Sequence, residues 1–158
     1  MRRRTSQEAL RITGELDGGH REPARVRELL TQLTGKPIDE SVTVFPLFHA
    51  DLGKNITLGT RVFIISGCTF QDQGGVVIGD DCLIGHSTVL ATLNHDLVLS
   101  RRADMHPAPI VIGNNVWIGS HTTVLPSAPL KPPRRCATGS PSAYRLVTNV
   151  LLSSNSRL

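Results

Sequence analysis

Apolar residues followed by glycine recur every six residues through the middle of the chain. The pairs are Leu52-Gly53, Leu58-Gly59, Ile78-Gly79, Ile84-Gly85, Ile112-Gly113 and Ile118-Gly119. A period of six fits neither a helix of 3.6 residues per turn nor the two-residue alternation of a simple strand. It is typical of a short strand and a corner, repeated, with one apolar side chain per hexad pointing inward. Stacked turns of such a coil would pair their backbones at about 4.8 Å.

The same period extends over a row of apolar positions that we expect to point inward. They are Leu52, Leu58, Ile64, Phe70, Ile78, Ile84, Leu90, Ile112, Ile118 and Val124. The register slips by two residues at Gly74-Gly75 and by sixteen between Leu90 and Ile112. We expect glycine after an inward residue because the backbone must turn there without a clash. A core of stacked aliphatic residues also agrees with an aromatic content of only 4%.

The N-terminal part of the chain has a helical pattern instead. Its apolar residues Val26, Leu29, Leu30 and Leu33 recur at helical spacing. Pro23 suits the first turn of a helix, and Gly35 is a stop signal. We therefore expect a helix over residues 24–33 that packs beside the coil.

These patterns divide the chain into three segments. Residues 1–45 form an N-terminal helical segment, residues 46–126 form the coil of hexapeptide repeats, and residues 127–158 form an atypical, irregular tail. Residues 126–158 hold five of the ten prolines, and the tail has no apolar–glycine hexad. The chain length of 158 residues suits a single compact unit.

The charge distribution argues against a nucleic-acid partner, although the net charge is +4. Residues 126–158 contain five basic residues and no acidic one, which leaves 12 basic against 13 acidic residues for 1–125. The excess of basic over acidic residues therefore belongs to the C-terminal part of the chain. No apolar stretch approaches the roughly 20 residues of a membrane span, and no apolar run follows the basic residues 2–4 as in a secretory signal. We expect a cytoplasmic protein with no membrane contact.

The three cysteines indicate neither a disulfide framework nor a zinc finger. Cys68, Cys82 and Cys136 are odd in number, widely spaced and without a C-x-x-C pair. We expect Cys68 and Cys82 to be small buried residues of the coil.

Four segments of the repeat region form a more specific pattern. They are Phe48-His49-Ala50-Asp51-Leu52-Gly53-Lys54-Asn55-Ile56, Phe70-Gln71-Asp72-Gln73-Gly74-Gly75, Asn94-His95-Asp96, and His106-Pro107-Ala108-Pro109-Ile110 running into Ile112-Gly113-Asn114-Asn115-Val116-Trp117-Ile118-Gly119-Ser120. With the sixteen-residue slip, they resemble the maltose and galactoside O-acetyltransferases of the hexapeptide-repeat acyltransferase superfamily. The resemblance covers about half of the chain. It implies an all-β fold that is a left-handed parallel β-helix, a homotrimer, acetyl-CoA as donor, and active sites between neighbouring subunits.

His95 is the candidate general base. It stands where the long break after Leu90 begins, so a rigid coil would hold the root of a protruding loop that carries it. Histidine can take a proton from an attacking hydroxyl near neutral pH. In the family that this chain resembles, a histidine at this position has that role.

The resemblance also implies contacts to coenzyme A. Trp117 directly precedes an inward position, so its side chain should point outward, and an exposed tryptophan suits an interface or a ligand. In the family this tryptophan lies beside the coenzyme A channel, Ser120 matches a serine that contacts coenzyme A, and Gly85 matches a small residue whose backbone approaches it. For Ser120 and Gly85, a purely structural role at a corner of the coil remains an equal alternative.

Asp51, Asp72 and Gln73 match residues that line the acceptor pocket of the sugar acetyltransferases. Carboxylates and amides suit sugar hydroxyls because they accept and donate hydrogen bonds in fixed directions. Two departures change this pocket: Gln73 stands where the galactoside enzymes have a carboxylate, and Ile65 stands where they have an asparagine. We expect a sugar-like small-molecule acceptor.

The chain departs from the family after Leu125-Pro126. Family members continue with at least one more turn and a Val-Thr-Lys-Asp segment that meets coenzyme A. From this departure we expect weaker coenzyme A binding and lower stability than in a full-length relative.

The expected function is acetyl-CoA-dependent O-acetyl transfer to a hydroxyl, without a metal. One alternative is a non-catalytic β-helix that serves as a scaffold. Another is a zinc-dependent β-helical carbonic anhydrase with three histidine ligands, but the six histidines include no closely spaced pair of the kind expected for it.

Overall fold

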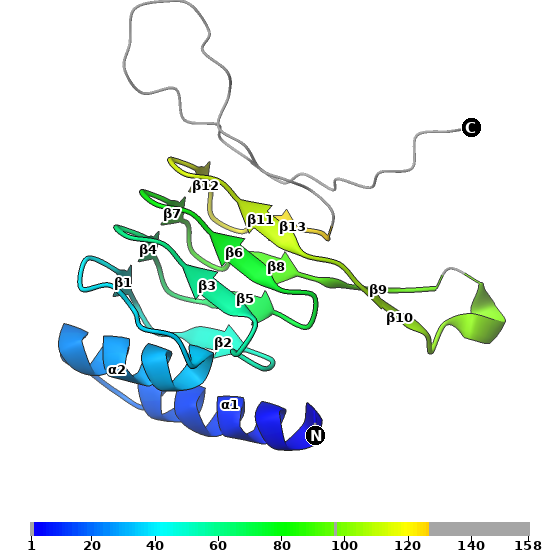
Figure 1. Ribbon diagram of the computed structural model, residues 1–158, viewed down its shortest axis with the longest axis horizontal. Helices are drawn as coiled ribbons and strands as arrows, with labels where there is room; N and C mark the ends of the chain where they lie inside the picture. The colour runs from blue at the N-terminus through cyan, green and yellow to red at the C-terminus, as the bar shows by residue number, and fades with distance from the viewer. Residues whose placement is uncertain (1, 97, 127–158) are drawn as a thin grey trace, which may run out of the picture.

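The computed structural model describes residues 2–96 and 98–126 as two helices beneath a coil of short strands (Figure 1). The helices are α1 (Arg2–Asp17) and α2 (Pro23–Thr34). The sequence predicted α2 but not α1. The tail predicted for residues 127–158 lies outside the described residues.

The coil is built from three parallel sheets. Its strands are β1 (Thr43–Val44), β2 (Phe48–Ala50), β3 (Ile56–Leu58), β4 (Phe63–Ile64), β5 (Cys68–Gln71), β6 (Val76–Ile78), β7 (Leu83–Ile84), β8 (Val89–Ala91), β11 (Ile110–Ile112), β12 (Trp117–Ile118) and β13 (Thr123–Val124). Sheet A has the order β1-β4-β7-β12, sheet B the order β13-β8-β5-β2, and sheet C the order β11-β6-β3. The chain passes through A, B and C in turn, so each turn lies on the one before. This arrangement confirms the predicted parallel β-helix.

An antiparallel hairpin interrupts the third turn. Strands β9 (Leu93–His95) and β10 (Met105–Pro107) pair with each other and with no other strand of the described residues. A short 3-10 helix, η1 (Leu99–Arg101), lies between them. Figure 1 shows this hairpin projecting away from the coil. It accounts for the sixteen-residue slip in the sequence pattern.

The predicted inward row is buried from Ile64 to Val124, but the prediction that Leu52 begins this row is wrong. Ala50, not Leu52, occupies the inward position at the end of β2, and Leu52 is only half-buried in the loop that follows. Ala50 and Leu58 are therefore eight residues apart, as are Phe70 and Ile78. The Leu52-Gly53 pair imitates the repeat but lies outside it.

All insertions into the hexads thus lie at one edge of the coil. The two-residue insertions follow β2 and β5, and the sixteen-residue insertion follows β8, each between sheet B and sheet C. We call the loops at residues 51–55 and 72–75, together with residues 92–109, the B–C edge. The other two edges of the coil keep the strict period of six.

A second inward row lies two residues before the first. Its members are Val62, Cys68, Val76, Cys82, Thr88, Ile110, Val116 and Thr122, all buried. The Sγ atom of Cys68 lies 3.0 Å from the carbonyl oxygen of Ile65, and the Oγ1 atom of Thr88 lies 2.8 Å from that of Gly85. Burial raises the pKa of both Cys68 and Cys82, so the thiols remain protonated donors. The prediction of small buried cysteines is confirmed for these two.

The glycines of the repeat are required by the stacking of turns rather than by the bend of the backbone. Gly59 and Gly79 do not have positive φ, whereas Arg61, Asp81 and Asn115 adopt the left-handed conformation at their corner with φ of 52°, 59° and 57°. A Cβ atom on Gly79 would lie 2.8 Å from the carbonyl carbon of Gly113 in the next turn. The expected reason for these glycines was therefore wrong, although their positions were informative.

The two helices cover the first turn of the coil. Their apolar residues share one core with those of the first turn: Ala9, Ile12, Leu16, Val26, Leu29, Leu30, Leu33, Val42, Val44, Phe48 and Ile56. Gly53, with φ of +76°, allows close contact with α2, because a Cβ there would overlap Leu33. Asp17 accepts a hydrogen bond of 3.0 Å from the amide of Phe48. The coil begins at Thr43, before the expected residue 46, because Val42 and Val44 already point inward.

The two helices were compared with what a membrane span requires. Neither helix within the described residues combines the length and the apolar character needed to cross a membrane. The cytoplasmic location expected from the sequence stays a prediction.

We expect Gly79→Ala to destabilise the protein by about 1–3 kcal/mol, because the added methyl group overpacks the contact between two turns. The free energy of unfolding from denaturant titration measures the effect. Gly14→Ala is the matched control: beyond the neighbouring backbone of α1 itself, no atom lies within 4 Å of a Cβ at this position, so the change should stabilise by about 0.5–1 kcal/mol. A Gly79→Ala protein as stable as the wild type would contradict the stacking requirement.

Candidate active site

The root of the hairpin is fixed to the second turn at the B–C edge. Thr92 is buried, and its Oγ1 accepts a hydrogen bond of 2.8 Å from the amide of Gly74. Its own amide donates to the carbonyl of Gln71 at 3.1 Å, and its carbonyl accepts from Ala108 at 2.9 Å. A Cβ on Gly74 would come within 2.5 Å of the Ala108 oxygen. The hairpin therefore leaves the coil from a rigid base.

Asp72 shapes the neighbouring loop instead of facing solvent. Its side chain is fully buried. Its Oδ1 accepts from the amide of Leu52 at 2.8 Å, and its Oδ2 accepts from the amide of Asn55 at 3.2 Å. The sequence placed Asp72 among the residues that line an acceptor pocket. In this structure its buried carboxylate accepts hydrogen bonds from backbone amides, so the residue stabilises the loop at residues 51–55.

Asp51 and Gln73, which the sequence analysis expected to line an acceptor pocket, lie together at the B–C edge. The Nε2 atom of Gln73 donates to the Oδ2 atom of Asp51 at 2.7 Å. The Oε1 atom of Gln73 is buried and has no hydrogen-bond partner among the described residues. Because an amide can donate where a carboxylate cannot, Gln73 holds the Asp51 carboxylate in place without adding a second negative charge. Ile65 lies elsewhere, directly after β4 of sheet A.

His95 is held by one directional hydrogen bond. It lies in β9 opposite Met105 of β10, and both side chains are exposed. Its Nδ1 atom lies 2.8 Å from the carbonyl oxygen of Arg102. A carbonyl can only accept, so Nδ1 carries the proton in the neutral ring and Nε2 keeps a free lone pair. This is the tautomer that a general base requires.

Asp96 is a candidate functional residue that the sequence pattern alone did not predict. Its carboxylate is only 15% exposed and contacts three groups of the hairpin. Oδ1 accepts from the amide of Val98 at 2.8 Å, while Oδ2 lies 3.3 Å from Nη2 of Arg101 and 3.6 Å from Nε2 of His106. The signal available in the sequence was an acidic residue next to a candidate base at the start of a long insertion.

The residues expected to contact coenzyme A lie on another part of the coil. Trp117 is in β12 of sheet A, points outward as expected and is 42% exposed. Ser120 is exposed at the corner between sheets A and B, above Gly85 of the previous turn. A Cβ on Gly85 would lie 2.5 Å from the amide nitrogen of Ser120, so packing alone requires glycine there.

The two groups of expected site residues are separated within one chain. Figure 1 shows β12 on one side of the coil and the β9–β10 hairpin projecting from the opposite side. The structure therefore brings Asp51 and Gln73 to the edge that carries His95, but it does not bring Trp117 and Ser120 to that edge.

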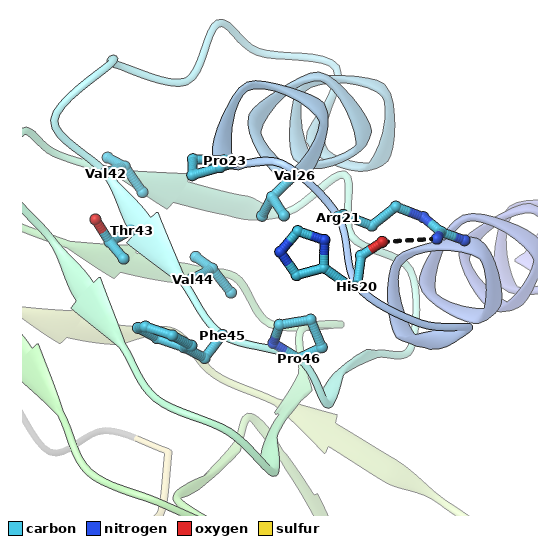
Figure 2. Close-up of a pocket in the computed structure, with 9 residues that line it drawn as sticks. All are labelled: His20, Arg21, Pro23, Val26, Val42, Thr43, Val44, Phe45 and Pro46. Carbon is cyan, nitrogen blue, oxygen red and sulfur yellow. Dashed lines mark hydrogen bonds between the residues drawn. The ribbon is translucent and has the colours of Figure 1, made fainter.

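A separate hollow lies between the α1–α2 connection and β1. Its volume is about 230 Å³, and it is lined by His20, Arg21, Pro23, Val26, Val42, Thr43, Val44, Phe45 and Pro46. Figure 2 shows the imidazole of His20 among Val26, Val44 and Pro46. None of the site residues predicted from the sequence lines this hollow. It is distinct from the candidate active site.

The zinc-dependent alternative would need a group of metal ligands. Within residues 2–96 and 98–126, no three His, Cys, Asp or Glu side chains are grouped so that they could hold a metal ion. Two histidines each approach a single carboxylate: His106 lies 3.6 Å from Asp96, and His49 lies 3.8 Å from Asp17.

Several known proteins resemble this chain in sequence and fold. A galactoside O-acetyltransferase of Escherichia coli (strain K12) is 32% identical over 114 residues, which are 71% of this chain and 56% of the relative. A crystal structure of a hexapeptide-repeat-containing acetyltransferase from Vibrio cholerae has a TM-score of 0.75 at 30% identity, covering 80% of this chain and 72% of that chain. Another, from Vibrio cholerae O1 biovar eltor in complex with acetyl coenzyme A, has a TM-score of 0.69 at 28% identity, covering 78% and 68%. No family model matches the chain.

The coil, its glycine pattern and these similarities define a hexapeptide-repeat protein. The chain belongs to the hexapeptide-repeat acetyltransferases, as the resemblance to maltose and galactoside O-acetyltransferases implied. The predicted left-handed parallel β-helix is thereby confirmed. The chain spans little more than half the length of the Escherichia coli relative.

We expect Asp72→Ala to lower the free energy of unfolding by about 1.5–3 kcal/mol, because it leaves two backbone amides without their charged acceptor. Asp104→Ala, at an exposed position of the hairpin region, should change stability by less than about 0.5 kcal/mol. Denaturant titration of both variants makes the comparison. Equal, small effects would show that Asp72 does not hold the 51–55 loop.

Proposed function

We propose that this protein is an acetyl-CoA-dependent O-acetyltransferase that acts on a hydroxyl of a sugar-like small molecule, with His95 as general base. Membership of the hexapeptide-repeat acetyltransferases supports the reaction class. The galactoside O-acetyltransferase relative supports a sugar-like acceptor, and the related structure in complex with acetyl coenzyme A supports the donor. The observation that carries the proposal is the hydrogen bond from His95 to Arg102, which leaves Nε2 free to accept a proton.

The chemistry required of the protein is proton transfer. Acetyl-CoA supplies an acetyl group activated as a thioester. As the acceptor oxygen forms its bond to the acetyl carbon, Nε2 of His95 takes the hydroxyl proton. When the carbon–sulfur bond breaks, the imidazolium returns this proton to the sulfur, so an O-acetyl ester and a free thiol result. General acid–base catalysis of this kind typically contributes about 10²- to 10⁴-fold.

The acceptor side of the site is assigned to the B–C edge. Asp51 keeps one carboxylate oxygen that Gln73 does not occupy, and this oxygen can accept a hydrogen bond from an acceptor hydroxyl. Asp72 contributes indirectly, by holding the 51–55 loop from below. A single carboxylate with a neutral amide beside it suits an uncharged polyhydroxylated molecule.

The donor side is assigned to Trp117 and Ser120 of a neighbouring copy in a homotrimer. Strand β12, which carries Trp117 and precedes Ser120, lies on the opposite side of the coil from the hairpin (Figure 1), so one chain alone does not join these residues to His95. Trp117 continues an apolar column on sheet A: it is in register with Leu83 of β7, and Leu83 is in register with the half-buried Phe63 of β4. Leu83 and Trp117 are 41% and 42% exposed. An apolar face of this kind suits a neighbouring chain and a bound ligand. Gly85 contributes by letting the turn that carries Ser120 stack closely.

We expect His95→Ala to lower kcat for acetyl transfer by at least about 10²-fold, because the attacking hydroxyl loses its base. The affinity for acetyl-CoA should stay nearly unchanged. Steady-state kinetics with a panel of sugar acceptors, together with calorimetric titration of acetyl-CoA, measures both quantities.

His86→Ala is the control for this experiment. His86 is exposed at an ordinary corner of the coil, and its backbone carbonyl accepts a hydrogen bond from the amide of His121 at 2.7 Å. This variant should keep most of the activity. Equal losses in the two variants would indicate structural damage, and a wild-type chain that does not bind acetyl-CoA would favour the non-catalytic scaffold.

A further inference from the structure

The tip of the hairpin is closed by a short chain of backbone hydrogen bonds. The amide of Asp96 donates to the carbonyl of Asp104 at 3.1 Å, and the amide of Asp104 donates to the carbonyl of Arg101 at 2.8 Å. Arg101 in turn donates to the carbonyl of Val98 at 2.9 Å. Arg102, which supplies the acceptor for His95, follows η1 directly. The position of its carbonyl therefore depends on how η1 is held.

The Asp96 carboxylate holds η1 at both ends. Oδ1 accepts from Val98, the residue that precedes η1, and Oδ2 lies 3.3 Å from the guanidinium of Arg101, the last residue of η1. Oδ2 also lies 3.6 Å from His106 of β10. A carboxylate that is only 15% exposed on a projecting hairpin thus connects η1 with the returning strand. Removing it would leave the Val98 amide and the Arg101 guanidinium without this partner.

Asp96 itself is unsuited to proton transfer with the acceptor. Side chains of consecutive residues in a strand point to opposite faces, so His95 at the end of β9 and Asp96 directly after it diverge. The Asp96 side chain lies toward His106, which pairs in register with Asn94 rather than with His95. Its side-chain contacts with Val98 and Arg101 connect it to His95 through η1 and the Arg102 carbonyl.

We propose that Asp96 is a positioning residue, which fixes His95 in its Nδ1–H tautomer by holding η1 and thereby the Arg102 carbonyl. This inference rests on the proposed function for its catalytic consequence, but not for its structural one. A free imidazole in water interconverts between tautomers, and a fixed acceptor at Nδ1 selects the form with an unprotonated Nε2. The hairpin sequence Asn94-His95-Asp96 would then supply both the base and the group that orients it.

The test reads the tautomer of His95 directly. Histidine-labelled ¹⁵N protein is compared by long-range proton–nitrogen NMR at a pH at which the His95 ring is neutral, for the wild type, Asp96→Asn, Asp96→Ala and Asp104→Asn. The wild type and Asp104→Asn should show the Nδ1–H form of His95. Asp96→Ala should show a mixture of tautomers. Asp96→Asn, which keeps an acceptor for Val98 but loses the charge facing Arg101, should lie between them.

Activity supplies the second readout. In Asp96→Ala, kcat should fall roughly 10- to 100-fold, as misplacement of a catalytic group does, with little change in the affinity for acetyl-CoA. Unchanged Nδ1–H signal in both Asp96 variants would overturn the positioning role, whether or not the protein is active. The expected tautomer shift in a wild-type protein without acetyl transfer would support the positioning role and refute the proposed function instead.

Discussion

The constraint on which this structure depends is that every turn of the coil must lie directly on the turn before it, in parallel register. Backbone pairing between turns is continuous in sheets A, B and C. Two inward rows fill the interior, with small residues such as Cys68 and Thr88 at the corners and large aliphatic residues between them. At positions such as Gly79 and Gly85, a Cβ atom would overlap the backbone of the next turn, so glycine is required there.

The same constraint decides where function can reside. A residue added within a sheet would shift every later inward position, whereas a residue added at a corner leaves the register intact. All three insertions are at the B–C edge, and this edge carries Asp51, Gln73 and His95. The coil thus supplies a rigid base, through Thr92 and Gly74, for a hairpin whose own geometry is set by local hydrogen bonds. Sheet A, which has no insertion, instead presents a flat face with Leu83 and Trp117 exposed.

The sequence predicted the coil because the stacking of turns requires apolar and glycine residues at regular intervals, which are visible as the repeat. It failed where a local pattern imitated the repeat: Leu52-Gly53 has the form of a dyad, but contact between Gly53 and Leu33 of α2 explains its glycine. Helix α1 was not predicted because only three apolar residues, Ala9, Ile12 and Leu16, mark its buried face, although their spacing is helical. At the site, residue types indicated Asp51, Gln73 and His95. The sequence could not show that backbone amides bury Asp72, nor that Asp96 holds η1, because both depend on contacts formed only after folding.

The most direct test of a site shared between copies of the chain is complementation between two variants, one changed at the proposed base and one at the proposed donor site, each of which should have low activity alone. His95→Ala and Trp117→Ala chains, purified separately, are unfolded and refolded together in equal amounts, and acetyl transfer is compared with that of each variant refolded alone. If one copy supplies His95 and its neighbour supplies Trp117, random mixing leaves about a quarter of the sites intact, so the mixture should regain about that fraction of wild-type activity. A mixture no more active than the separate variants would contradict the shared site.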